Sequence, residues 1–259
     1  LICLNIRVFT WTATFVILDH MQQPTPAKPL PVYLQISELL ARQIKAGFWR
    51  EGERLPTEAE LAKTLDVAVG TLRKSLALLE TQGVLERIQG SGTYVKKVLG
   101  TQQIYELFRL ELTSGPGLPT AHILDVKSLK RPAYVPALGE GAGDRAWRVR
   151  RVRFLSQMPV AMEEIWFSAE AVSSLKASDF GDSMYMFYQE RFGVWIARVE
   201  DRLSAAPAPD WSTQPCTLKP GDCAGFIERV SWTATNAIAE FSRTWFDPTV
   251  CIYSSRLRQ

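Results

Sequence analysis

Four arginines crowd one short stretch of this 259-residue chain: Arg148, Arg150, Arg151 and Arg153. Alternate residues of a strand share a face, so Arg151 and Arg153 lie together on one side. Planar guanidinium groups bind a carboxylate or a phosphate through two parallel hydrogen bonds. The spacing is typical of an anion clamp, and it is equally typical of a solvated basic edge strand.

A second polar group has the chemistry to contact DNA. Thr71, Arg73 and Lys74 begin a predicted helix, which is where a recognition helix meets base edges and phosphates. A long arginine there, or Arg87 further along, pairs with guanine O6 and N7. The turn Gln89-Gly90-Ser91-Gly92 carries little bulk, so its amides can approach phosphates or the minor groove. A three-helix unit with a hairpin that never touches DNA gives the same pattern.

The elements that position this second group follow from periodicity. Apolar residues spaced three and four apart predict a first helix that ends near Gly47: Tyr33, Ile36, Leu39, Leu40 and Ile44. A capping box formed by Thr57 and Glu60 predicts that a short second helix begins at Thr57. A third helix stops at Gly83, and strands at 84–88 and 93–96 flank the glycine-rich turn. Together these elements predict a winged helix-turn-helix.

The arginine-rich stretch belongs to a longer region in which β-rich runs alternate with turns. The predicted strands are 121–128, 147–155, 160–167, 194–204, 223–233, 239–246 and 251–257. Helices are expected at Ala169 to Leu175 and at Met184 to Phe192. We therefore predict an α+β fold with three parts: a winged helix-turn-helix over residues 31–96, a linker over 97–103, and a domain with a mostly antiparallel sheet over 104–259.

The first thirty residues are predicted to be an extension that is non-native or disordered. Leu1 is not an initiator, and Met21 followed by a Pro-rich run indicates the natural start. Arg7 interrupts the apolar run and no cleavage site precedes Met21, which argues against a signal peptide. The run is also too short and too polar to span a bilayer. We expect a cytoplasmic protein with no membrane partner.

Three stretches resemble, in order, the motifs of the GntR family of transcription regulators. Residues 52–62 read GERLPTEAELA, residues 67–73 read VAVGTLR and residues 87–95 read RIQGSGTYV. The resemblance implies DNA contacts from Arg54, Thr57, Val69, Thr71, Arg73, Lys74, Arg87, Gln89, Gly90, Ser91 and Gly92. Ala59 and Ala68-Val69 stand where relatives often have polar residues, so Arg73 and the wing are expected to carry more of the recognition, with Val69 near a thymine methyl.

The C-terminal region is similar to the UTRA effector domain of the HutC subfamily, whose fold is shared with chorismate lyase. Three motifs carry this resemblance: Arg151-Val152-Arg153-Phe154 followed by PVAME at 159–163, DSMY at 182–185, and AIAEFS at 237–242. It implies an effector pocket lined by Arg151, Arg153, Glu163, Ser183, Tyr185 and Glu240. Asn236-Ala237-Ile238-Ala239 replaces the Gly and Pro that usually precede this glutamate. Ser183 at a helix N-terminus would add a hydroxyl and free amides to the anion site.

The composition and the absence of several sequence motifs argue against some classes of protein. A net charge of +3 is far below that of a polybasic DNA binder. Four cysteines and two histidines show no metal-ligand spacing, so we expect neither a metal nor a cofactor. The chain has no nucleophile elbow, P-loop, H-E-x-x-H or dinucleotide fingerprint, so we expect no enzyme. The alternative is an enzyme acting on a small anionic metabolite through the chorismate-lyase-like domain; an architectural DNA binder is disfavoured by the modest charge.

The expected protein is therefore a DNA-binding transcription regulator and repressor. It is expected to bind a two-fold double-stranded DNA operator as a homodimer, with one helix-turn-helix for each half-site. A small anionic effector, such as a sugar phosphate, a phosphonate or an amino-acid derivative, is expected to shift the population of domain arrangements that fit the operator.

Overall fold

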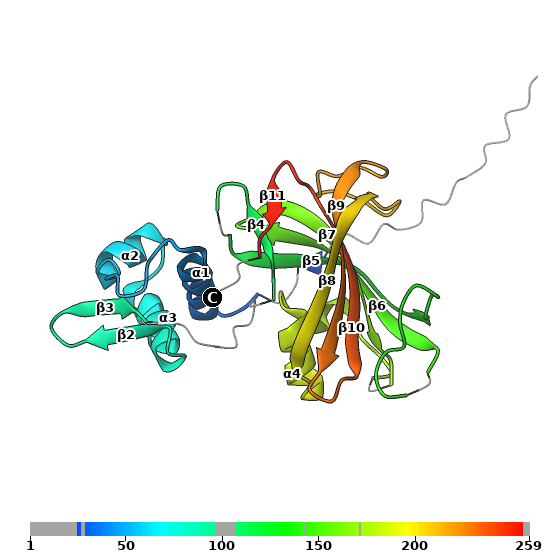
Figure 1. Ribbon diagram of the computed structural model, residues 1–259, viewed down its shortest axis with the longest axis horizontal. Helices are drawn as coiled ribbons and strands as arrows, with labels where there is room; N and C mark the ends of the chain where they lie inside the picture. The colour runs from blue at the N-terminus through cyan, green and yellow to red at the C-terminus, as the bar shows by residue number, and fades with distance from the viewer. Residues whose placement is uncertain are drawn as a thin grey trace, which may run out of the picture.

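The computed structural model describes residues 25–26, 29–96, 107–115, 117–141, 143–170 and 172–255. Figure 1 shows two lobes, a small helical one from the N-terminal part of the chain and a larger one built on a sheet. The predicted linker, residues 97–103, lies outside the described residues, and so does most of the expected N-terminal extension. No helix in the described ranges is long and apolar enough to cross a membrane.

The N-terminal lobe has the predicted winged helix-turn-helix arrangement. Its described elements are α1 (Val32–Ala46), α2 (Glu58–Thr64), α3 (Val69–Thr81), β2 (Leu85–Ile88) and β3 (Gly92–Val95). The chain before α2 runs along the wing, because Leu55 N–H donates to Thr93 O at 2.9 Å. The wing, which is the hairpin of β2 and β3, is thereby attached to the segment that leads into α2 and α3.

Local signals fix the ends of these helices. Gly47 ends α1 in the left-handed conformation, with a φ of 86° that favours glycine. Thr57 caps α2 in the predicted capping box: its hydroxyl oxygen accepts from Glu60 N–H at 3.3 Å, and the Glu60 carboxylate accepts from Thr57 N–H at 2.9 Å. The position of α2, and of Glu58 in its first turn, is therefore set by short-range contacts.

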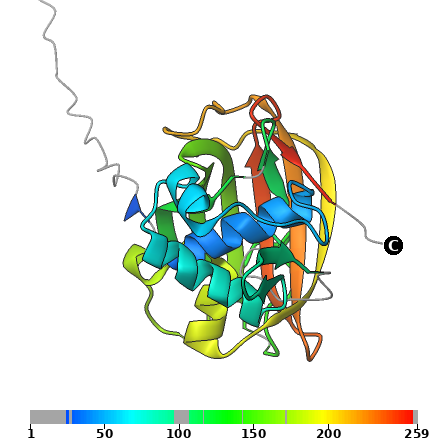
Figure 2. The same cartoon turned by 90° about the vertical axis from the view of Figure 1, so that its left-hand side faces the viewer.

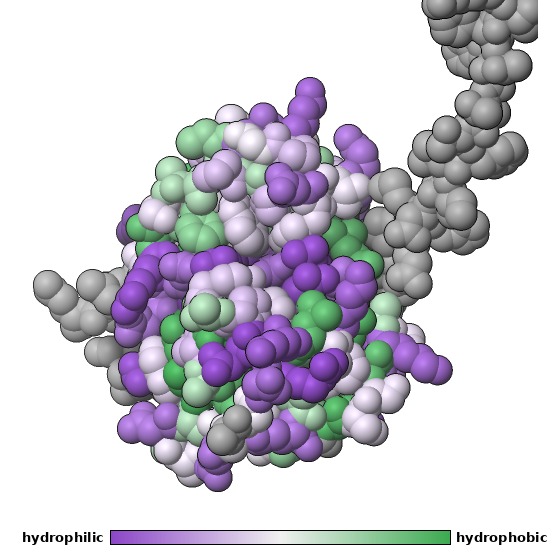
Figure 3. Space-filling view, turned by 90° about the vertical axis from the view of Figure 1, so that its right-hand side faces the viewer, coloured by the Kyte–Doolittle hydropathy of each residue, from purple (hydrophilic) through white to green (hydrophobic). Residues whose placement is uncertain are grey.

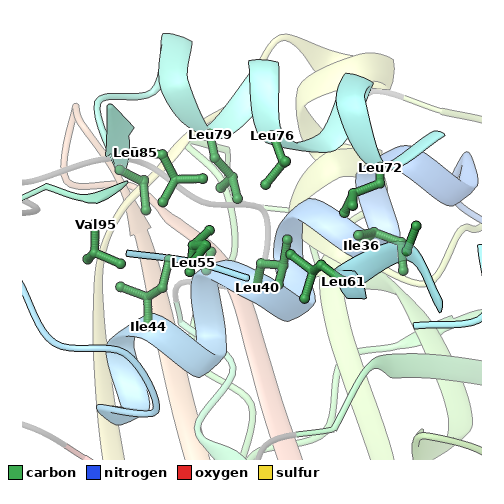
Figure 4. Close-up of a cluster of buried hydrophobic side chains, with 13 residues drawn as sticks. Ile36, Leu40, Ile44, Leu55, Leu61, Leu72, Leu76, Leu79, Leu85 and Val95 are labelled. Atoms are coloured by element: carbon green, nitrogen blue, oxygen red, sulfur yellow. The ribbon is translucent and has the colours of Figure 1, made fainter. Parts of the chain in front are cut away.

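Leucines from α1 and α3 form the core of the N-terminal lobe. Leu40, Leu72 and Leu79 are fully buried, and Figure 4 shows these side chains pointing toward one another from α1 and α3. The open end of the hairpin closes the core, since Leu85 at the start of β2 and Val95 at the end of β3 are buried in the same cluster. This packing holds α3 and the wing in one rigid unit.

The larger lobe is an antiparallel sheet of seven strands in the described ranges, ordered β1-β5-β6-β7-β10-β9-β8. Its strands are β1 (Thr25–Pro26), β5 (Pro119–Lys130), β6 (Arg145–Leu155), β7 (Met158–Ser168), β8 (Ile196–Pro207), β9 (Cys223–Thr233) and β10 (Ile238–Phe246). A separate pair joins β4 (Leu110–Leu112) to β11 (Cys251–Tyr253). The α+β fold with a mostly antiparallel sheet is confirmed.

Helix α4 (Met184–Phe192) packs on one face of this sheet. Phe187 and Tyr188 of α4 contact Phe167 of β7, with ring centroids 6.0 and 5.5 Å apart. Ser183 caps the helix, its hydroxyl oxygen accepting from Met186 N–H at 3.3 Å. The helix N-terminus therefore points along the sheet face that carries Arg151 and Arg153.

The predicted helix at Ala169 to Leu175 is wrong. In a helix the Val172 carbonyl would accept from Lys176 N–H, but Trp147 of β6 donates its indole N–H to that carbonyl at 3.1 Å. Lys176 N–H donates instead to the Asp179 carboxylate at 2.7 Å, in a short 3-10 turn at Ala177–Asp179. A contact from a distant strand thus overrides the local helical preference.

Structured residues also occur before residue 31, where the N-terminal domain was expected to begin. Thr25–Pro26 pair with Ile123 and His122 of β5, and Leu30 is buried. The last predicted strand is shorter than expected, since β11 ends at Tyr253 and residues 256–259 lie outside the described ranges.

Helix α1 is the part of the N-terminal lobe nearest to the sheet, and the wing is farthest from it (Figure 1). Figure 2 shows the N-terminal lobe in front of the larger lobe. Arg42 of α1 bridges the lobes, because its guanidinium donates to the backbone oxygen of Leu110 at 2.8 Å. On the opposite side of the molecule, the exposed face of the larger lobe mixes hydrophilic and hydrophobic residues (Figure 3).

Leu79→Ala tests whether the leucine core holds α3 and the wing. Because Leu79 is fully buried, we expect the free energy of unfolding to fall by about 2–5 kcal/mol, from lost burial and the cavity left behind. Urea denaturation followed by far-UV circular dichroism measures this change. The neighbouring exposed residue serves as the control, and Glu80→Ala should change stability by less than about 0.5 kcal/mol. Equal effects of the two substitutions would contradict the described core.

Candidate functional site

The first candidate surface is formed where the beginnings of α2 and α3 meet the wing. The Glu58 carboxylate accepts from Arg73 Nε at 2.6 Å and also pairs with Arg87 of β2. The Arg73 and Arg87 side chains remain 64% and 51% exposed. Two arginines that the sequence places on separate elements therefore lie on one surface, with their guanidinium groups open to solvent.

Glu58 controls the charge of this surface. The hydrogen bond from Arg73 lowers the pKa of Glu58, and Arg87 adds to the effect against a smaller opposing contribution from burial. The carboxylate is thus ionised at neutral pH and orients both guanidinium groups. DNA phosphates would compete with Glu58 for the same donors.

The other predicted DNA contacts from the two helices lie near these arginines in the fold. Val69 is the first residue of α3 and is 37% exposed, while Lys74 is exposed and Thr71 is half-buried. The hydroxyl of Thr57 is engaged by Glu60, to whose carboxylate it donates at 2.7 Å. Thr57 therefore has a clear structural role in capping α2.

The wing tip is shaped by two glycines with positive φ, Gly90 at 74° and Gly92 at 138°. A Cβ atom at Gly92 would lie only 2.6 Å from Nε of Arg54, so the glycine makes room for this side chain. Gln89 is exposed, and the Ser91 hydroxyl lies 2.6 Å from the Tyr94 hydroxyl. The wing thus brings Arg54, Gln89 and Ser91 to one end of the hairpin.

The second candidate site is a small polar cavity of about 70 Å³ between the sheet, the N-terminus of α4 and the segment 108–110. All six residues predicted to line an effector pocket are found around it: Arg151 and Arg153 of β6, Glu163 of β7, Ser183 and Tyr185 at the start of α4, and Glu240 of β10. The structure therefore brings together side chains that are far apart in the sequence.

Two buried arginines and one carboxylate form the floor of this cavity. Arg151 Nε donates to Glu163 Oε2 at 2.6 Å, and Nε of Arg153 lies 3.9 Å from the same oxygen. Burial opposes ionisation of Glu163, but Arg151 and Arg153 outweigh it and lower its pKa. Because Arg151 and Arg153 are 6% and 1% exposed, this is an arginine pair inside the lobe and not a solvated edge.

The backbone carbonyl of Asp182 holds both arginines at the start of α4. It accepts from Arg153 Nη1 at 2.6 Å and from Arg151 Nη1 at 3.4 Å. The Asp182 carboxylate accepts from Ala121 N–H at 2.8 Å, and burial raises its pKa. The guanidinium groups therefore point toward the helix N-terminus, where backbone amides favour an anion.

The opposite wall presents hydroxyl groups and a third arginine. The Tyr185 hydroxyl lies 3.1 Å from the Ser231 hydroxyl and accepts from Arg229 at 3.5 Å. Arg229 is held by two hydrogen bonds to Asp201, at 2.6 and 2.7 Å. Burial raises the pKa of Tyr185 to about 12, so it remains a neutral donor.

Glu240 differs from Glu163 in its electrostatic environment. Burial raises the pKa of Glu240, although the Tyr188 hydroxyl donates to its Oε2 at 2.6 Å and opposes that rise. Glu163 therefore balances one of the two arginine charges at the floor, and Glu240 balances the other less completely. The cavity has the chemistry to take a small anion at the arginines, with hydroxyl contacts at Tyr185 and Ser231.

Three residues at these sites were missed by sequence reasoning. Glu58 occurs in the sequence analysis only within the motif at 52–62, and its two arginine partners depend on how α3 and the wing fold back. Arg229 lies on the same strand face as Ile227 and Ser231, which the alternation of residues along a strand predicts. Its position in the cavity could not be predicted, because it depends on the order of the strands in the sheet. Phe108 follows a stretch without periodicity, and no sequence signal places it at the cavity.

Two family models match this chain. Residues 32–95 match the model for bacterial regulatory proteins of the gntR family, and residues 117–249 match the UTRA domain. The two ranges correspond to the winged helix-turn-helix and to the lobe that holds the cavity.

Among similar proteins, the HTH-type transcriptional regulator SmoD of Agrobacterium fabrum is 43% identical over 229 residues, covering 88% of this chain and 97% of the relative. The mannosyl-D-glycerate transport/metabolism system repressor MngR of Escherichia coli is 30% identical over 226 residues, covering 84% and 92%. A ligand-binding domain of a putative GntR-family transcriptional regulator from Bordetella bronchiseptica shares the fold, with a TM-score of 0.51 at 23% identity, covering 58% of this chain and 96% of that one.

Glu163→Gln tests the buried ion pair. Loss of the carboxylate leaves the buried Arg151 guanidinium without its paired counter-charge, so we expect the free energy of unfolding to fall by about 3–5 kcal/mol. The folded-state pKa of Glu163 lies below 4.5, so its contribution is complete above about pH 4.5 and is lost as the pH falls through that lowered value. The variant should therefore lose less thermal stability than wild type on acidification.

Melting curves recorded from neutral pH to below pH 4.5 measure both the loss of stability in Glu163→Gln and its weaker dependence on pH. The control is Glu200→Gln, which removes the carboxylate of an exposed pair with Arg202 and should cost less than about 1 kcal/mol. Equal acid sensitivity of wild type and Glu163→Gln would show that the buried pair does not contribute as described.

Proposed function

Because this chain belongs to the GntR family of bacterial transcriptional regulators, in the branch that carries a UTRA effector domain, we propose that it is a repressor released from DNA by a small anion. The observation that carries this proposal is the pair of buried arginines, Arg151 and Arg153, turned toward a cavity at the N-terminus of α4. The enzyme alternative has no support, since the relatives are named as transcriptional regulators and repressors.

Operator recognition is proposed to use α3 and the wing together. Val69, Thr71, Arg73 and Lys74 enter the major groove at the beginning of α3. The wing region contacts phosphates or the minor groove through Arg54, Arg87, Gln89, Gly90, Ser91 and Gly92. Thr57 contributes a further DNA contact from the N-terminus of α2. The shared contact with Glu58 supports this, because it brings the arginines of α3 and β2 to the same surface.

A two-fold operator requires two copies of the chain. One helix-turn-helix reads one half-site, and half-sites lie about one helical turn apart, so a homodimer is the simplest assembly that reads both. Action on chromosomal DNA places the protein in the cytoplasm.

The effector is proposed to be a small hydroxylated anion. Its carboxylate, phosphate or phosphonate group pairs with Arg151 and Arg153 near Ser183, and its hydroxyl or amine groups reach Tyr185 and Glu240. Glu163 holds the arginines in place. One relative is named as the repressor of a mannosyl-D-glycerate transport and metabolism system. For this reason the first compounds to test are sugar-derived acids, together with sugar phosphates and amino-acid derivatives.

Arg73→Ala tests the DNA surface. Because Arg73 is exposed, we expect the melting temperature to stay close to wild type while affinity for a DNA duplex selected from a random pool falls about 5- to 150-fold. Gly92→Ala should also weaken binding, since the new Cβ collides with Arg54. Fluorescence anisotropy measures affinity, with the surface substitution Arg202→Ala as control. Unchanged affinity in both variants would contradict the proposed interface.

A thermal-shift screen of anionic metabolites tests the pocket. At a ligand concentration of 100 times Kd the stabilisation is about 2.7 kcal/mol, which raises the melting temperature of a lobe of this size by roughly 5–10 °C. Arg153→Lys keeps the charge but loses the planar fork, so it should remove most of this shift. The uncharged analogue of each hit is the matched control. A shift that survives in Arg153→Lys would place the ligand elsewhere.

A further inference from the structure

The wall of the effector cavity that is not part of the sheet or of α4 is the segment 108–110, which begins the second lobe. The cavity measures about 70 Å³, whereas pockets for small metabolites span roughly 300–1,000 Å³. A ligand must therefore widen it. The sheet strands are locked by ladder hydrogen bonds, so the walls that can yield are the start of α4 and this segment.

Arg42 of α1 holds this segment from the other lobe. Arg42 donates from Nη1 to the Phe108 carbonyl at 3.2 Å and from Nη2 to the Leu110 carbonyl at 2.8 Å. Its guanidinium carbon also lies 5.2 Å from the centroid of the Phe108 ring. Arg42 is only 7% exposed, so these contacts are made inside the boundary between the lobes.

The same aromatic ring contacts the anion-binding arginine. The guanidinium carbon of Arg153 lies 4.6 Å from the centroid of Phe108. Phe108 therefore touches one arginine that faces the cavity and another that belongs to the DNA-binding lobe. Any movement of Arg153 toward a bound anion changes what this ring packs against.

The segment before α1 also lies near this cavity. The backbone of Leu30, two residues before α1, is close enough to the Asp182 carboxyl group to oppose the rise of its pKa, and the Asp182 carbonyl accepts from both arginines. Leu30 precedes α1 and Arg42 lies in the last third of the helix. The chain therefore approaches the cavity walls at two separate points.

We propose that Phe108, held between Arg153 of the effector cavity and Arg42 of α1, couples anion binding to the position of the DNA-binding lobe. This inference rests on the proposed function. An anion that takes the guanidinium of Arg153 draws it away from the Phe108 ring, and a metabolite larger than the cavity also displaces the ring. In both cases the two hydrogen bonds from Arg42 weaken. Helix α1 is then freed at Arg42, and the lobe to which α1 belongs changes its position.

Hydrogen–deuterium exchange of the full-length chain, with and without inorganic phosphate at tens of millimolar, tests the coupling. In wild type, phosphate should slow exchange in peptides covering 182–186 and speed exchange in peptides from Val32–Ala46 by about fivefold, the lower end of coupling between sites. In Arg42→Gln, which lies outside the cavity lining, the response at 182–186 should remain and the response of α1 should vanish. In Phe108→Leu the response of α1 should vanish as well. Arg50→Gln, a substitution of an exposed arginine in the same lobe, is the control and should respond as wild type does.

Each outcome decides one claim. Slower exchange at 182–186 with unchanged exchange in α1 of wild type overturns the coupling and leaves the anion site standing. A response of α1 that persists in both Phe108→Leu and Arg42→Gln also overturns it. No change at 182–186 overturns the anion site itself, and the coupling with it.

Discussion

Arg151 and Arg153 are buried on the sheet face near α4, with Glu163 of the neighbouring strand as their counter-charge, and the rest of the site is built around this burial. Moving a guanidinium group out of water costs several kcal/mol unless charge and hydrogen bonds replace the lost hydration. The Glu163 carboxylate replaces part of the lost hydration, and the backbone carbonyl of Asp182 replaces another part. The guanidinium donors that the pair presents at the N-terminus of α4 make an anion the natural ligand, and they make the geometry around the pair sensitive to whether that anion is bound.

The position of the pair explains how a pocket in one lobe can act on DNA through the other. Helix α1 packs against α3 through its leucines and reaches the cavity wall through Arg42. One helix therefore belongs to the DNA-binding core and to the boundary with the effector lobe. A ligand shifts such an equilibrium only by its different affinity for the two arrangements, and a cavity that must widen supplies that difference.

Much of the fold was predictable because its signals are local. The capping box at Thr57, the glycine stop at Gly47 and the period-two runs of the sheet each follow from a few neighbouring residues. The face shared by Arg151 and Arg153 was predictable for the same reason. The wrong helix at Ala169 to Leu175 and the unforeseen roles of Glu58 and Phe108 depend on contacts from distant elements, which a single sequence does not encode in any short pattern.

The affinity for operator DNA, measured with and without the anion that binds the buried arginines, shows whether the pocket controls DNA binding. Fluorescence anisotropy of a labelled operator, titrated with protein at saturating anion, should show a Kd at least about tenfold higher than without it. An anion that occupies the pocket, as shown by protection of 182–186, yet leaves the operator Kd unchanged would contradict the account.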